Sequence, residues 1–184
     1  MRKDLGQKCN FLPLPVLIIG TYDEQGNPNA MNAAWGVKYD GNQVIIVLSH
    51  HKTTENLEKT GAFTVSFATK KTEEISDYFG IASGKSEDKI AKAGVHVTKS
   101  KFVNAPIIEE YPLTMECKVI SYEDEVLIGE VVNASIDEEY LDENGHIDVD
   151  KMEIIAFDEI CNTYRVLGGV VGKAFADGMK IKNK

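Results

Sequence analysis

The stretch that decides the fold, residues 16–37, reads VLIIGTYDEQGNPNAMNAAWGV. Its first seven residues, 16–22, are apolar and rich in β-branched side chains, which is typical of a buried strand. Residues 23–28 (DEQGNP) concentrate the residue types that favour turns. The chain then resumes with a second strand pattern over residues 29–37, so the stretch predicts a β-hairpin.

Further strands are expected on both sides of a few short helices. The strand patterns lie at residues 43–49, 62–68, 113–122, 126–136, 154–157 and 164–167. Thr53 as N-cap and Gly61 as a left-handed C-terminal residue predict one helix between them. A second short helix is expected at residues 72–78, and a loop that turns helical at 83–92. This pattern indicates a mainly β fold, a barrel or a sandwich, rather than a doubly wound parallel sheet.

The bulk properties of the chain limit its partners and its location. No linker-like composition interrupts its 184 residues, so residues 1–184 are expected to form a single domain. The net charge of -9 argues against nucleic acid as the main partner. Three widely spaced cysteines without a CxxC pair fit free thiols in the cytoplasm. No apolar stretch approaches the roughly 20 residues that span a bilayer, so no membrane association is expected.

The segment from Ser49 to Asn56 (SHHKTTEN) is the best candidate for an anion site. It places a cation, Lys52, and the hydroxyl groups of Thr53 and Thr54 between a strong strand and a helix N-terminus. Free N–H groups and the helix dipole favour an anion there. By itself, the segment fits an ordinary helix cap beside a surface lysine better than an anion site, because threonine caps are common.

Two other segments have the composition of a ligand site. Residues 29–36 (NAMNAAWG) are small and polar, so a flat ligand could approach the backbone, although Trp35 alone would fit a core position. Residues 83–85 (SGK), with Lys89 beyond them, could face an anion or form an ordinary loop. No metal site is predicted, because the adjacent His50 and His51 would point to opposite faces of a strand.

Together these segments resemble a known family. PVLIIGTYDEQGNPNAMNAAWGV (residues 15–37), HKTTENLEKTGAFTVSF (51–67) and DYFGIASGKSEDK (77–89) are similar to the flavin reductase-like proteins, and most of all to flavoredoxins. The similarity continues through Pro112-Leu113, residues 116–118 (ECK), 129–131 (GEV) and 164–168 (YRVLG). It therefore covers most of the chain in the expected order.

The resemblance implies a six-stranded split β-barrel, a homodimer, and non-covalently bound FMN near the subunit interface. By position, Asn32, Ala33, Ala34 and Trp35 would line the isoalloxazine ring. Lys52 and Thr53, with His51, would hold the phosphate, while Ser83, Gly84 and Lys89 would close the pocket. The expected cofactor-binding set is Asn32, Ala33, Ala34, Trp35, Ser49, His51, Lys52, Thr53, Ser83, Gly84 and Lys89.

The resulting functional hypothesis is an FMN-dependent oxidoreductase without a protein catalytic residue, since hydride transfer from a nicotinamide needs close stacking more than an acid or a base. NADH, NADPH or a redox protein would supply electrons. Two alternatives remain: a non-catalytic FMN-binding carrier or sensor, and an enzyme similar to pyridoxamine phosphate oxidases, to which the chain is less similar.

Overall fold

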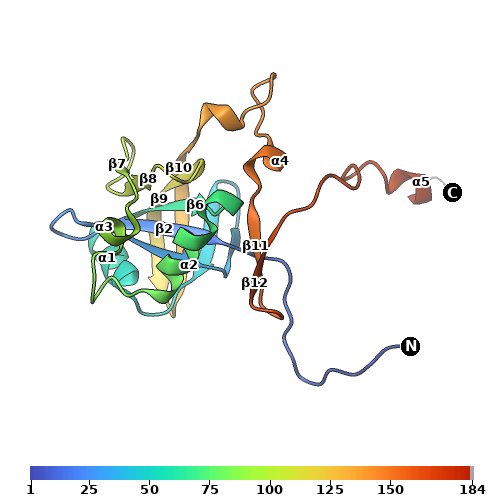
Figure 1. Cartoon of the computed structure of the whole chain (residues 1–184), viewed down its shortest axis with the longest axis horizontal. Helices are drawn as coiled ribbons and strands as arrows, with labels where there is room; N and C mark the ends of the chain where they lie inside the picture. Colours follow the sequence, from blue (N-terminus) through green and yellow to red (C-terminus); the bar gives the residue numbers. More distant parts are fainter. Residues whose placement is uncertain (183–184) are drawn as a thin grey trace.

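The computed structural model describes residues 1–182 and shows a mainly β protein (Figure 1). Its largest unit is a curled sheet of seven strands in the order β3-β2-β6-β9-β10-β5-β4, with antiparallel neighbours. These strands are β2 (Leu17–Tyr22), β3 (Pro28–Ala33), β4 (Gly36–Lys38), β5 (Gln43–Val47), β6 (Ala62–Phe67), β9 (Leu113–Glu123) and β10 (Val126–Ile136).

The two edges of this sheet are joined by only two residues, Ala34 and Trp35, which link β3 to β4. Three Cα–Cα steps of about 3.8 Å allow at most about 11 Å between Ala33 and Gly36, so the sheet curls until its edges approach. A Cβ atom on Gly36 would lie 2.6 Å from Leu17 Cδ1 in β2. Counted as one interrupted strand, β3 and β4 complete the expected ring of six.

The prediction of one continuous strand over residues 29–37 is therefore wrong in one respect. The chain leaves one edge of the sheet after Ala33 and enters the opposite edge at Gly36. The change of edge depends on the tertiary structure, because the curled sheet brings its two edges together. The alternation of residues along the sequence contains no information about this curl. The predicted hairpin itself is confirmed, because β2 and β3 pair antiparallel from Leu17 with Ala33 to Tyr22 with Pro28.

Smaller elements surround the barrel. The helices are α1 (Lys52–Thr60), α2 (Glu73–Ile81), α3 (Lys89–Ala93), α4 (Val149–Met152) and α5 (Met179–Lys182), with 3-10 turns at Lys70–Thr72 and Glu138–Tyr140. A second sheet has the order β1-β11-β12, and a third joins β7 to β8. These strands are β1 (Leu14–Pro15), β7 (Val97–Lys99), β8 (Pro106–Ile108), β11 (Ile155–Asp158) and β12 (Thr163–Val166). Strands β1, β7 and β8 were not predicted, because two or three residues carry no readable alternation.

Strand β2 separates two hydrophobic cores. Leu17 and Ile19 belong to the cluster inside the barrel, whereas Ile18 packs outside it with Phe79 of α2 and Ile155 of β11. Burial on both faces explains why this strand is an unbroken apolar run rather than an alternating one. The outer core fixes α2 across β3, which positions the candidate site.

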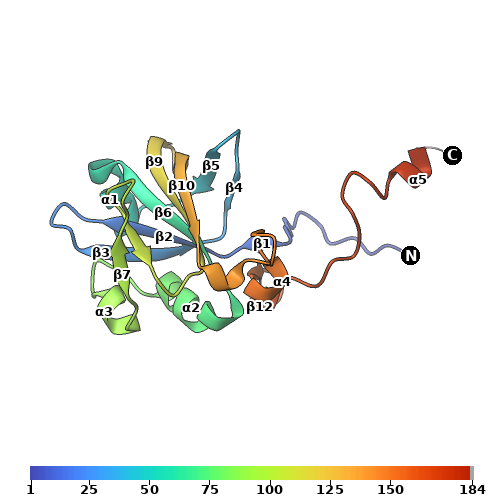
Figure 2. The same cartoon turned by 90° about the horizontal axis from the view of Figure 1, so that it is seen from above.

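The N-terminal arm and the C-terminal segment leave the body on the same side, beyond β11 and β12 (Figures 1 and 2). Val170, Val171 and Phe175 in the C-terminal segment are almost completely exposed. Within the described part of the chain, every helix is too short or too polar to span a bilayer. The side chains of Cys9, Cys117 and Cys161 are free thiols.

Candidate functional site

The first turn of α1 lies directly after the strand β5 and the loop that follows it. His51 is the N-cap residue, and the Thr54 hydroxyl accepts a hydrogen bond from the His51 N–H (2.9 Å) and donates one to the His51 carbonyl (2.9 Å). The predicted N-cap, Thr53, is wrong by two residues, because Thr54 reaches back to cap the helix. At the other end, Gly61 adopts the predicted left-handed conformation with φ 65°.

Capping by Thr54 leaves Thr53 available for another contact. Its side chain is 1% exposed, and its hydroxyl oxygen accepts a hydrogen bond from Asn29 Nδ2 in β3 (2.8 Å). The N–H groups of Lys52 and Thr53 belong to the first turn, where an α-helix offers no carbonyl partner. This turn therefore directs unpaired donors and the positive end of the helix dipole away from the helix.

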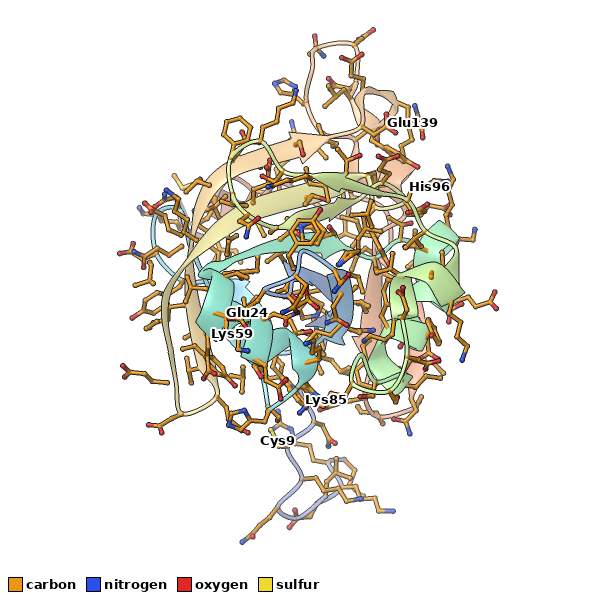
Figure 3. The ribbon with its side chains drawn as sticks, turned by 90° about the vertical axis from the view of Figure 1, so that its left-hand side faces the viewer. Cys9, Glu24, Lys59, Lys85, His96 and Glu139 are labelled. Atoms are coloured by element: carbon orange, nitrogen blue, oxygen red, sulfur yellow. The ribbon has the colours of Figure 1, made fainter. Side chains whose placement is uncertain are left out.

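The loop at Ser83 and Gly84 packs against this turn from the other side. A Cβ atom on Gly84 would lie 2.2 Å from Asn29 Oδ1 and 3.4 Å from Lys52 Cγ. Only glycine permits so close an approach, although its φ is not in the left-handed region. Lys85, labelled in Figure 3, pairs with Glu55 of α1 at 2.5 Å and joins the loop to the helix.

These elements enclose a polar cavity of about 320 Å³. Of the predicted cofactor-binding residues, the structure brings seven together in its lining: Asn32, His51, Lys52, Thr53, Ser83, Gly84 and Lys89. The other lining residues are Asn29, Met31, His50, Phe79, Gly80, Ile81, Ala82 and Lys85. Asn32 is held in place by a hydrogen bond from its Nδ2 to the Ser76 carbonyl of α2 (3.0 Å).

Four predicted residues lie outside this lining. Ala33 is 7% exposed and packs in the inner core, because neighbouring residues of a strand point to opposite faces. Ala34 and Trp35 occupy the link between β3 and β4, and Trp35 is 61% exposed. Ser49 is exposed in the loop before α1. The residues expected around the phosphate thus line one cavity, while Ala34 and Trp35, expected on the ring side of the site, lie on an open surface.

Lys89 is a buried cation at the cavity wall. Its side chain is 4% exposed, and its Nζ donates hydrogen bonds to the carbonyls of Phe79 (3.2 Å) and Ala82 (3.3 Å) at the end of α2. Burial lowers the pKa of Lys89 to about 8, against a smaller opposing effect of Glu87. The lysine therefore stabilises the α2 end of the cavity. An anion placed there would favour its charged form and raise its pKa.

Sequence reasoning did not select several lining residues. Asn29 and His50 lie inside the segments already identified, but nothing in the pattern distinguished them from their neighbours, and Lys85 was considered only as part of a segment that could face an anion. The residues at the end of α2 reach the cavity only because that helix packs across β3, which is a tertiary fact. Within residues 1–182, no group of three or more His, Cys, Asp or Glu side chains could hold a metal ion.

Comparison with known proteins identifies the family. The family described as "Flavin reductase like domain" matches residues 9–151, so this chain belongs to the flavin reductase like family. A curated relative, an uncharacterized protein of Aquifex aeolicus (strain VF5), is 28% identical over 127 residues. That alignment covers 67% of this chain but only 59% of the Aquifex protein.

Solved structures agree with this assignment. The flavoredoxin of Desulfovibrio vulgaris (Miyazaki F) is 32% identical with a TM-score of 0.92, covering 97% of this chain and 100% of its own. A flavoredoxin from Methanosarcina acetivorans is 26% identical with a TM-score of 0.89, covering 98% and 99%. A split barrel protein of Shewanella frigidimarina NCIMB 400, 20% identical with a TM-score of 0.78 over 90% and 87%, shares the fold. The predicted split β-barrel is confirmed.

Proposed function

We propose that this protein is an FMN-binding oxidoreductase of the flavin reductase or flavoredoxin type. It takes electrons from NADH, NADPH or a redox protein. Membership of the flavin reductase like family and similarity to two flavoredoxins support the flavin chemistry. The observation that carries the proposal is the cavity where the first turn of α1, Lys52 and Gly84 converge.

The residues of this cavity fit a flavin phosphate. The N–H groups of Lys52 and Thr53 and the Lys52 ammonium supply donors and positive charge for a phosphate. Gly84 keeps the loop side free of a Cβ atom that would collide with Asn29. FMN, when bound, supplies a ring system that takes up and releases two electrons.

The ring side of the site extends from Asn32 along the link between the barrel edges. Asn32 is fixed on α2, and Trp35 presents a large exposed aromatic surface beside the strand. In the proposed complex, Ala33 and Ala34 contribute backbone, and Ser49 borders the open side. These residues bind and orient the ring, because transfer of a hydride depends on close stacking.

We also propose that the protein works as a single-domain homodimer in the cytoplasm. Trp35, Val37 and Tyr39, at and around β4, are between 57% and 65% exposed. They adjoin an apolar cavity of about 340 Å³ that Leu17, Val37 and Phe67 help to line. Such a contiguous apolar surface is typical of an interaction site, and a second copy would cover both it and the open ring side.

Two measurements on the purified protein test this function. Titration with FMN should give a saturable perturbation of the flavin absorption spectrum. Mixing the FMN complex with NADH or NADPH without oxygen should then bleach the flavin absorption if a nicotinamide is the donor. Bleaching only by a reduced redox protein would identify a flavoredoxin-type donor, and bleaching by none of these would favour the carrier or sensor. Failure to bind FMN would contradict the proposal.

A further inference from the structure

Another cavity of about 340 Å³ continues from the candidate site at the end away from Trp35. It is separate from the apolar cavity described above and is called the second cavity, the candidate site being the first. The two cavities share five lining residues, namely Asn29, Lys52, Gly84, Lys85 and Lys89. Beyond them, the second cavity is completed by Asp23, Asn27, Pro28, Glu87 and Asp88. Strand β3 runs from Pro28 to Ala33, so the second cavity, the first turn of α1 and the ring side follow one another along this strand.

The sign of the charge changes where the two cavities meet. Every lysine of the second cavity, that is Lys52, Lys85 and Lys89, is shared with the candidate site. The charged residues that line only the second cavity are carboxylates: Asp23, Glu87 and Asp88. A ligand that passes the lysines therefore meets negative charge.

Backbone hydrogen bonds hold Asp23 and Asp88 in position, whereas Glu87 forms an ion pair with Lys92 Nζ (2.6 Å) that offsets its charge. Asp23 Oδ1 accepts from the N–H groups of Gln25 (2.9 Å) and Asn27 (2.8 Å) in the turn between β2 and β3. Hydrogen bonding, chiefly from the Asn27 side chain, keeps the pKa of Asp23 below its usual value, so the group is ionised at neutral pH. Asp88 Oδ1 accepts from the Ala91 N–H (3.0 Å) as the N-cap of α3.

We propose that Asp23 and Asp88 make the site selective for a flavin that ends in a phosphate monoester. The proposal rests on the flavin function proposed above and adds its specificity. The phosphate of FMN would end among the lysines at the junction. The diphosphate of FAD continues into a second phosphate and a nucleoside, which would have to enter the second cavity against fixed negative charge.

The test compares the affinities for FMN and FAD by calorimetric titration in the wild type, Asp23→Asn, Asp88→Asn and the double variant. Asparagine removes the charge and keeps an oxygen that can accept the same backbone N–H groups, although at position 23 its NH2 group replaces the Oδ2 atom that accepts from Asn27 Nδ2 (3.0 Å). We expect the wild type to prefer FMN by at least tenfold. Each substitution should reduce this preference by roughly three- to tenfold through tighter FAD binding, as for like charges near a protein surface.

Asp142→Asn is the matched control, because Asp142 Oδ1 accepts from the N–H groups of Asn144 (2.8 Å) and His146 (2.8 Å) in another turn. It should leave the preference unchanged. High salt should narrow the preference of the wild type, because salt screens charge but leaves a steric barrier intact.

The proposal is overturned if the wild type binds FAD as tightly as FMN, or if the preference survives in both single variants. Either result would leave the flavin function standing. Loss of all FMN binding by the wild type would instead contradict the flavin function itself.

Discussion

Lys52 is the residue at which the flavin proposal can be tested most directly. Lys52→Ala removes one charge-assisted contact to the phosphate, worth about 1.5–3 kcal/mol, so FMN affinity should fall roughly 10- to 150-fold. Riboflavin has no phosphate, and its affinity should fall far less. Titration of both ligands against the wild type and the variant measures the difference.

A surface lysine outside the cavity provides the control for this experiment. Lys99 is exposed in β7, so Lys99→Ala should change neither affinity. If Lys52→Ala weakened FMN and riboflavin equally, Lys52 would not contact the phosphate.

The buried Lys89 predicts a pH dependence of FMN binding. In the free protein its pKa is lowered to about 8 by burial, and a bound phosphate dianion would favour the charged form and raise this pKa. FMN affinity should therefore be highest at about pH 7, where the phosphate is a dianion and Lys89 is charged, and fall as pH rises through 8, by at most about tenfold per pH unit. Calorimetric titrations from about pH 6.5 to about pH 9.5, on both sides of that pKa, measure the slope.

Lys89→Met should remove most of this slope, and riboflavin binding should lack it. For folding without ligand the sign is opposite. The unfolded chain keeps the lysine protonated up to its ordinary pKa of 10.5, so the contribution of Lys89 to stability rises with pH between about 8 and 10.5. An FMN affinity that does not change across the alkaline range would place the phosphate away from Lys89.

The site residues that could be predicted from the sequence are those whose role depends on their near neighbours in the chain. Lys52 lies at the start of a helix and Gly84 lies in a loop, and both features can be recognised from the residues around them. Asn29 is as close to the cavity, yet its role depends on Thr53 and Gly84, which are 24 and 55 positions away. Ala33 shows the converse, since its side chain belongs to the core although its neighbour Asn32 faces the cavity.

Among the elements, the loop at Gly84 has the tightest steric requirement in the site. Gly84→Ala would place a Cβ atom 2.2 Å from Asn29 Oδ1, so Asn29 must move and its hydrogen bond to Thr53 must lengthen or break. We expect FMN affinity to fall by about tenfold, equivalent to one lost hydrogen bond. Fluorescence titration of the variant with FMN measures it.

Gly80→Ala is the matched control, because Gly80 also lines the cavity but lies within α2. A Cβ atom there would be 3.4 Å from Asn32 Cβ, an ordinary contact, and alanine favours the helix by roughly 0.5–1 kcal/mol. This variant should melt at the same temperature as the wild type or higher. Similar FMN affinities in the two variants would show that the loop does not depend on glycine.

Elements with long patterns were predictable, and the shortest were not. Strand β10 begins and ends where the sequence predicts, because eleven residues between clear turns leave little ambiguity. The turn before it, between the predicted strands at residues 113–122 and 126–136, uses Asp124 and Glu125, with φ of 49° and 64°. Both residues adopt a conformation that favours glycine, but neither of them is glycine. The composition therefore gave no direct signal for the position of this turn.

For the whole molecule, the proposed dimer predicts that a charge on the exposed apolar surface will separate the subunits. Val37 is 65% exposed beside the apolar cavity, so Val37→Glu should shift the protein from dimer to monomer and weaken FMN binding on the open ring side. Sedimentation equilibrium measures the first effect. Ile147→Glu, a change at an exposed apolar residue in the acidic segment of residues 137–150, should have neither effect. A wild type that sediments as a monomer would contradict the dimer.

The link between β3 and β4 has a consequence for how the barrel and its ligand influence each other. Covalent geometry at Ala34 and Trp35, rather than side-chain packing alone, sets the circumference of the barrel at this point. A flavin ring resting on these two residues would touch both margins of the sheet at once. Its arrival would then slow amide hydrogen exchange in β3 and in β4 together, although the two strands lie at opposite ends of the hydrogen-bonded order.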